Sequence, residues 1–105
     1  MVLELTVENN EEFEQLLDNK DIRISKALVD TILTNLKGRK RHIPFMSVVI
    51  LEDESVYDMT IDRKEFEDTL NIQLPIFERN ELFEECSEMV KALNYLKSKP
   101  KPKQK

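Results

Sequence analysis

The chain has 105 residues, of which 40% are hydrophobic and 35% are charged, a composition typical of one small globular domain with well-solvated surfaces. Its single glycine excludes the glycine-rich loops that cradle phosphates, and its single cysteine excludes an internal disulfide. The net charge is −5, but the last nine residues, KSKPKPKQK, carry five lysines and no acid, which leaves −10 on the first 96 residues. Such an acidic body repels phosphate backbones over most of its surface.

The first two elements are a strand and a short helix. Residues 2–7 alternate between apolar and polar side chains, which predicts a half-buried strand. Asn9 followed by Glu12 resembles a capping box, and apolar residues then recur at helical spacing, so we expect a helix over about residues 10–19.

A second helix is predicted to begin at Ser25, which can act as its N-cap. The apolar stripe of this helix consists of Leu28, Val29, Ile32, Leu33 and Leu36. Gly38 is expected to end it as a left-handed residue after the last turn.

The one compact basic cluster of the body, Arg39, Lys40 and Arg41, follows this glycine. We favour a solvated loop that balances nearby acids, and the alternative is a contact to phosphate groups. His42 has no second histidine or cysteine beside it, so we expect no metal site here.

A hairpin is predicted over residues 43–61. Residues 43–51 are apolar at nearly every position and rich in β-branched side chains, which indicates a central strand with both faces at least partly covered. A polar turn follows, and residues 56–61 alternate again. The turn holds three carboxylates, but calcium loops use a longer spacing and a glycine, so no cation is expected.

The remaining chain predicts paired helices. Asp62 and Glu65 resemble a second capping box, and Pro75 should either kink the following helix or split it into residues 63–70 and 75–79. The chain then reverses into a last helix that runs to about Lys97.

The predicted fold is therefore α+β: a small three-stranded antiparallel sheet, in the order β-α-α-β-β-α-α, with a C-terminal helical hairpin. We expect a single domain over residues 1–97 and a disordered basic Lys/Pro tail over residues 98–105.

The last helix carries an apolar seam, with residues at steps of four, three, four and three, that needs an apolar partner. Adding the neighbouring apolar residues gives the predicted protein-interaction surface: Leu82, Phe83, Cys86, Met89, Val90, Leu93 and Leu96. Because Cys86 lies on the seam, a buried thiol is expected.

Residues 78–96, ERNELFEECSEMVKALNYL, resemble the UVR motif, a helical hairpin of bacterial excision-repair proteins and of regulators of Clp proteases. The resemblance rests on the positions Asn80, Glu81, Leu82, Phe83, Glu84, Cys86, Met89, Leu93 and Leu96. It covers the paired helices of residues 63–96 alone, and it implies association with another protein. The alternative is an ordinary antiparallel helix pair packed on its own sheet.

These observations favour a small non-enzymatic interaction or regulatory protein that binds a protein partner or forms a homodimer. Its small size and high charge would suit a protein encoded by a phage. The acids are spread along helix faces, so no catalytic residue, metal or cofactor is predicted. A nucleic-acid-binding regulator that uses Arg39, Lys40, Arg41 and the lysine-rich tail is the second hypothesis. No stretch approaches the roughly 18 apolar residues of a membrane span, and no secretion signal is evident, so a cytoplasmic location is expected.

Overall fold

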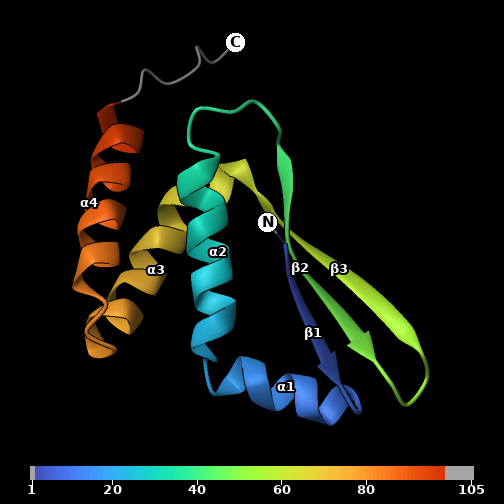
Figure 1. The fold of residues 1–105 in the computed structure, drawn as a ribbon. Coiled ribbons are helices and arrows are strands. Elements are labelled where there is room, and N and C mark those ends of the chain that lie inside the picture. Colours follow the sequence, from blue (N-terminus) through green and yellow to red (C-terminus); the bar gives the residue numbers. More distant parts are fainter. Residues whose placement is uncertain (1, 99–105) are drawn as a thin grey trace. The chain divides into compact units, whose positions relative to one another are not determined.

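A computed structural model describes residues 2–98 of the chain (Figure 1). The structure is α+β, and its elements follow the predicted order. The chain divides into two compact units, Met1–Phe66 and Glu67–Lys105. The first unit contains the sheet and two helices, and the second contains a pair of helices.

The central strand of the sheet is β2 (His42–Ile50), which lies between β1 (Leu3–Val7) and β3 (Ser55–Asp62). β3 runs antiparallel to β2, with a bulge between Pro44 and Met46, so the predicted hairpin is confirmed. β1 runs parallel to β2. The sheet is therefore mixed.

The prediction of a fully antiparallel sheet is wrong for this β1–β2 pair. Two helices, α1 (Asn10–Asp18) and α2 (Ile22–Thr34), separate β1 from β2 along the chain. A crossover of that kind brings the chain back to the end at which the first strand began, and the next strand then runs in the same direction. Figure 1 shows α1 at the end of β1 and α2 returning along the sheet.

One face of the sheet forms the core of the first unit. Met46, Val48 and Ile50 of β2 are buried there, beside Leu5 and Val7 of β1. α2 packs on β2 and buries its own apolar stripe, including Val29 and Ile32. On the opposite face Ser47 and Val49 are half-buried, which agrees with the expectation that both faces of this strand are at least partly covered.

Side-chain caps explain where the first two helices begin. The Asn9 side chain accepts a hydrogen bond from Glu12 N (2.9 Å), so this predicted cap of α1 is confirmed. α2 begins three residues before the predicted cap Ser25, which is buried inside the helix. Asp21 caps α2 instead, because its carboxylate accepts from Arg23 N (2.9 Å) and also forms an ion pair with the Arg23 side chain (3.0 Å).

The predicted left-handed conformation of Gly38 is also wrong. α2 ends at Thr34 with Asn35 as its C-cap, and among the described residues the positive φ angles belong to Lys20, Glu54 and Glu81. Gly38 serves a different purpose, which involves the side chain of Arg63.

Pro75 does not split the helix in which it lies. A 3₁₀ turn (Arg63–Glu65) leads into α3 (Phe66–Arg79), which continues through Pro75. Of the two alternatives, a kink or a split into residues 63–70 and 75–79, the split is therefore wrong. The carbonyl that proline leaves without a partner belongs to Asn71, and both residues are exposed, so water can satisfy it. Asp62 caps the 3₁₀ turn by accepting from Lys64 N (2.9 Å).

The chain reverses between α3 and α4 (Phe83–Ser98) through a tight hydrogen-bonded turn. Leu82 N donates to Phe77 O (3.0 Å) and Glu81 N donates to Glu78 O (3.0 Å), while Glu81 adopts a φ of 58°. This is a Schellman cap, which satisfies the last carbonyls of α3. The predicted tail of residues 98–105 lies outside the described residues, except for Ser98, the last residue of α4. No helix in residues 2–98 has the length and apolar character that a membrane crossing requires.

We predict that Asp21→Ala lowers the free energy of unfolding by about 1 kcal/mol at neutral pH, because α2 loses its N-cap. The Arg23 guanidinium holds the pKa of Asp21 below its ordinary value of 3.8. A lowered folded-state pKa stabilises the fold above the ordinary value, and this contribution disappears as the pH falls through the folded-state pKa. Urea denaturation should therefore show a gap between wild type and variant at pH 7 that narrows as the pH falls below the ordinary Asp value of 3.8.

Asp30→Ala is the matched control, because Asp30 is an exposed residue of the same helix whose side chain caps nothing. Its stability should stay within about 0.5 kcal/mol of wild type. Equal losses in the two variants would contradict the assignment of Asp21 as the cap.

Candidate functional site

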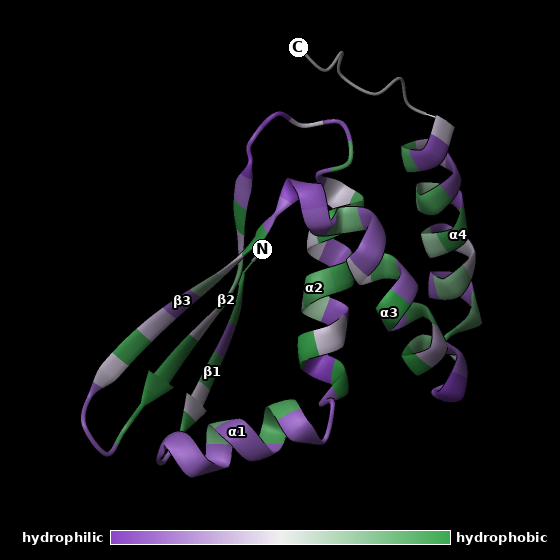
Figure 2. Ribbon diagram, turned by 180° about the vertical axis from the view of Figure 1, so that it is seen from behind, coloured by the Kyte–Doolittle hydropathy of each residue, from purple (hydrophilic) through white to green (hydrophobic). Residues whose placement is uncertain are grey.

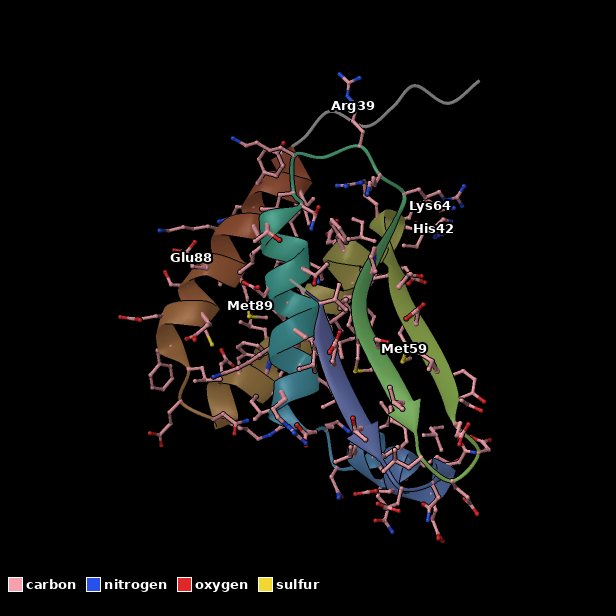
Figure 3. All side chains as sticks on the ribbon, turned by 45° about the vertical axis from the view of Figure 1, so that its right-hand side comes forward. Arg39, His42, Met59, Lys64, Glu88 and Met89 are labelled. Atoms are coloured by element: carbon pink, nitrogen blue, oxygen red, sulfur yellow. The ribbon has the colours of Figure 1, made fainter. Side chains whose placement is uncertain are left out.

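The structure divides the predicted interaction surface of α4 into a buried part and an exposed part. Cys86, Met89 and Leu93 are buried in the folded chain, and Leu82 and Leu96 are half-buried. Phe83 and Val90 are exposed, at 63% and 44% of their surface. Figure 3 shows the division on α4, where Glu88 points away from the side that carries Met89.

The exposed residues form a narrow stripe without charge. Phe83, Ser87, Val90 and Asn94 follow one another at helical spacing and are all exposed. We call these four residues the Phe83 face. Charged residues lie beside it on α4, among them Glu88 and Lys91, whose charged groups are 3.6 Å apart. An uncharged centre with a charged margin is the usual layout of a protein contact surface.

The thiol of Cys86 does not belong to a reactive site. Cys86 is free and buried, as the sequence predicts. Burial raises the pKa of this thiol, and the Glu78 and Glu85 carboxylates raise it further. A thiol with a raised pKa stays protonated at neutral pH and is a poor nucleophile.

The second candidate site is a cluster of cations at one end of the β2–β3 hairpin. Arg39, Lys40 and Arg41 are all exposed in the loop between α2 and β2. Because β3 pairs antiparallel with β2 and places Asp62 opposite His42, the chain after β3 returns to this loop. The return of the chain places two more cations, Arg63 and Lys64, beside the loop. The sequence alone did not predict that these two residues join the cluster. We call the six residues Arg39, Lys40, Arg41, His42, Arg63 and Lys64 the basic corner.

The figures show the corner directly. Lys64 lies beside His42, and Arg39 stands at the tip of the loop (Figure 3). Figure 2 shows that the loop between α2 and β2 is hydrophilic along most of its length, unlike the apolar strand that follows it.

Arg63 holds the loop in place. Its Nε donates to Lys40 O (2.5 Å), its Nη1 donates to Asn35 O (2.6 Å) and its backbone N donates to Arg41 O (2.7 Å). The guanidinium also lies 5.0 Å from the centre of the Phe66 ring, within the range of a cation–π contact. One side chain thus joins the end of α2, the loop and the start of α3.

This clamp explains the only glycine of the chain. A Cβ on Gly38 would come within 3.1 Å of Arg63 Nη2, which is tighter than an ordinary contact. Arg63 Nη2 itself is buried and makes no hydrogen bond within the described chain. A side chain at position 38 would therefore require the Arg63 guanidinium to shift by a few tenths of an ångström.

Asp62 neutralises one part of the basic corner. Its carboxylate accepts from Arg41 Nε (3.2 Å) and lies 4.0 Å from His42 Nδ1. The hydrogen bond from Lys64 N holds the pKa of Asp62 below its ordinary value, and Arg41 and His42 lower this pKa further. Arg39, Lys40 and Lys64 form no ion pair with any residue of the described chain.

Residues 2–98 contain no group of three His, Cys, Asp or Glu side chains placed to hold a metal ion. In the comparisons with protein families, curated proteins and solved structures, no family model, curated protein or solved structure matches this chain. The UVR-like character of residues 78–96 and the cytoplasmic location stay predictions.

We predict that Arg63→Ala lowers the free energy of unfolding by about 2 kcal/mol or more, because two carbonyls lose a charged donor. Lys64→Ala is the matched control, since the Lys64 side chain is exposed and only its backbone N bonds to Asp62. The control should change stability by less than about 0.5 kcal/mol. Urea denaturation of both variants, with amide exchange of residues 36–41, measures the effect, and unchanged exchange in Arg63→Ala would contradict the clamp.

Proposed function

We propose that the protein is a small non-enzymatic association protein that binds a protein partner through the Phe83 face of α4. The observation that carries the proposal is the exposure of Phe83 and Val90 on a stripe that lacks charge, on a helix that is otherwise rich in acids. Large apolar side chains in such a setting mark contact sites more often than single scattered ones do.

The expected strength of this contact follows from the area available. Burying a phenylalanine or valine side chain contributes about 1.5–3 kcal/mol each. Two such anchors with a polar margin suit a contact that forms and dissociates readily, because association also costs translational freedom and side-chain order. We therefore expect a regulatory partner that is engaged transiently.

A binding role is also favoured over catalysis by the placement of the acids. Glu84 and Glu88 are exposed on the surface of α4, where water solvates both carboxylates. General acid–base chemistry relies on groups that a pocket gathers around one reacting atom.

The test is affinity purification of the tagged protein from its host, with mass spectrometry of the bound proteins. A specific partner retained by wild type should be lost from the Phe83→Asp, Val90→Asp variant, because each change places a carboxylate at the centre of the contact. A loss of at least about tenfold in recovery corresponds to removing one apolar anchor.

The matched control is Glu84→Ala, Lys91→Ala, which alters the charged margin on the same helix and leaves Phe83 and Val90 in place. This variant should retain the partner. Recovery of the same proteins with the Asp variant and with wild type would contradict the proposal.

A second candidate function is the binding of a polyanion, such as a nucleic-acid backbone, at the basic corner. It is favoured by the Arg63 clamp, which orders the loop that carries Arg39 and Lys40. A loop that is already ordered loses less conformational entropy on binding. The acidic charge of the remaining body confines such binding to this corner.

We predict that Arg39→Gln, Lys40→Gln, Lys64→Gln abolishes binding to a single-stranded DNA 20-mer, measured by fluorescence anisotropy at about 0.05 M salt. In wild type the logarithm of the binding constant should fall with the logarithm of salt with a slope of about −2, as for three phosphate contacts on a single strand. The control is Lys20→Gln, Lys26→Gln, Lys91→Gln, which removes the same charge at exposed sites outside the corner. Equal losses in the two triple variants would refute a localised site.

A further inference from the structure

Within residues 2–98, the outer edge of β3 pairs with no other strand. It is the last strand in the order β1-β2-β3 and pairs with β2 alone. Its middle is open to solvent, with Val56 60% and Tyr57 48% exposed and with Asp58 and Thr60 exposed beside them. A long exposed edge strand offers a row of backbone donors and acceptors to another strand.

We propose that two copies of this chain pair β3 with β3 in an antiparallel register centred on Met59, which joins their sheets into one. This pairing is independent of the Phe83 face and of the basic corner. It assigns the open edge to a second copy of the chain rather than to an unrelated strand.

The register follows from overlap and charge. An antiparallel pair of identical strands has a two-fold axis, and with Ser55–Asp62 as the strand, centres at Asp58 and at Met59 give the greatest overlap. A centre at Asp58 places that carboxylate against its own copy, which is destabilising. A centre at Met59 places Asp58 opposite Thr60 of the copy, and residues 56–62 then pair with residues 62–56.

The chosen register also matches the two faces of the sheet. Tyr57 and Met59 are paired with Val48 and Met46 of β2, so they lie on the apolar face. In the proposed dimer Tyr57 lies opposite Ile61 of the copy, and the two Met59 side chains meet at the axis. The apolar face thus continues across the junction and covers the exposed ring of Tyr57.

The charge of Asp58 disfavours some pairing registers and tolerates others. Charged residues on an edge strand usually discourage pairing. Asp58 is the one charge in the middle of β3, and it disfavours only those registers in which a carboxylate of the second strand lies opposite. A centre at Thr60, for example, would place Asp58 opposite Asp62. Of the two registers with the greatest overlap, only the one centred on Met59 therefore has no pair of directly opposed carboxylates.

The first experiment changes the charge at Thr60, which is exposed and lies opposite Asp58 in the proposed dimer. Thr60→Lys should tighten the dimer and Thr60→Asp should weaken it, each by about 2- to 30-fold in Kd, because two identical pairs change together. Sedimentation equilibrium at one fixed salt concentration measures Kd for both. Thr6→Lys and Thr6→Asp are the matched controls, since Thr6 is an exposed threonine on the other edge strand, and neither should change Kd.

The second experiment tests the register by cross-linking. In a Cys86→Ala background, Met59→Cys should form a disulfide-linked dimer on mild oxidation, because directly opposed residues have Cα atoms about 4.5–5.5 Å apart, within disulfide range. Tyr57→Cys should not, because its own copy would be displaced by four residues, or about 14 Å.

Opposite effects of the two Thr60 variants, together with cross-linking at position 59 and not at 57, support the proposal. A wild-type chain that stays monomeric at millimolar concentration overturns it. A dimer whose Kd is the same in both Thr60 variants, or one that cross-links at 57, forms through another surface or register and also overturns it.

Discussion

The pairing of β2 with β3 is the constraint on which the first unit depends. Its register, from His42 opposite Asp62 to Ile50 opposite Ser55, fixes which side chains lie on the buried face and which residues meet at the open end of the hairpin. Side chains alternate along a strand, so a shift of one residue would turn the apolar set of β3 toward solvent. It would also separate Arg63 from the carbonyls to which it donates.

Asp62 and Arg63 show how much of the local structure follows from that register. Asp62 ends β3, caps the 3₁₀ turn and forms an ion pair with Arg41. Arg63 returns to the end of α2 and to the loop before β2. Two adjacent residues therefore fix the basic corner, and the corner is a consequence of strand pairing rather than of the basic sequence of the loop alone. In the second unit, a single residue likewise fixes a local structure: the left-handed backbone of Glu81 forms the turn between α3 and α4.

The sequence predicted those features whose signals are local. Alternation identified β1 and β3, the apolar, β-branched run of residues 43–51 identified β2, and Asn9 with Glu12 identified the start of α1. It did not predict features that depend on distant residues. The direction of β1 depends on the crossover through two helices, and the role of Gly38 depends on Arg63, 25 positions away. Arg63 and Lys64 could have been added to the basic corner, since a hairpin brings together the residues that flank its two strands.

The helix seam illustrates a limit of periodicity. Spacing correctly placed Cys86, Met89 and Leu93 on one side of α4, but it cannot distinguish a stripe that the chain covers itself from one that a partner covers. In the structure these three residues are buried, and the uncharged Phe83 face beside them is exposed.

Nuclear Overhauser effects between backbone protons of β2 and β3 in solution measure the register of the two strands directly. We predict contacts between the directly opposed pairs Met46 and Met59, Ser47 and Asp58, and Val48 and Tyr57. Contacts displaced by one residue, such as Met46 with Asp58 and Ser47 with Tyr57, would contradict this strand pairing, because neither the buried face nor the Arg63 clamp can form in the displaced register.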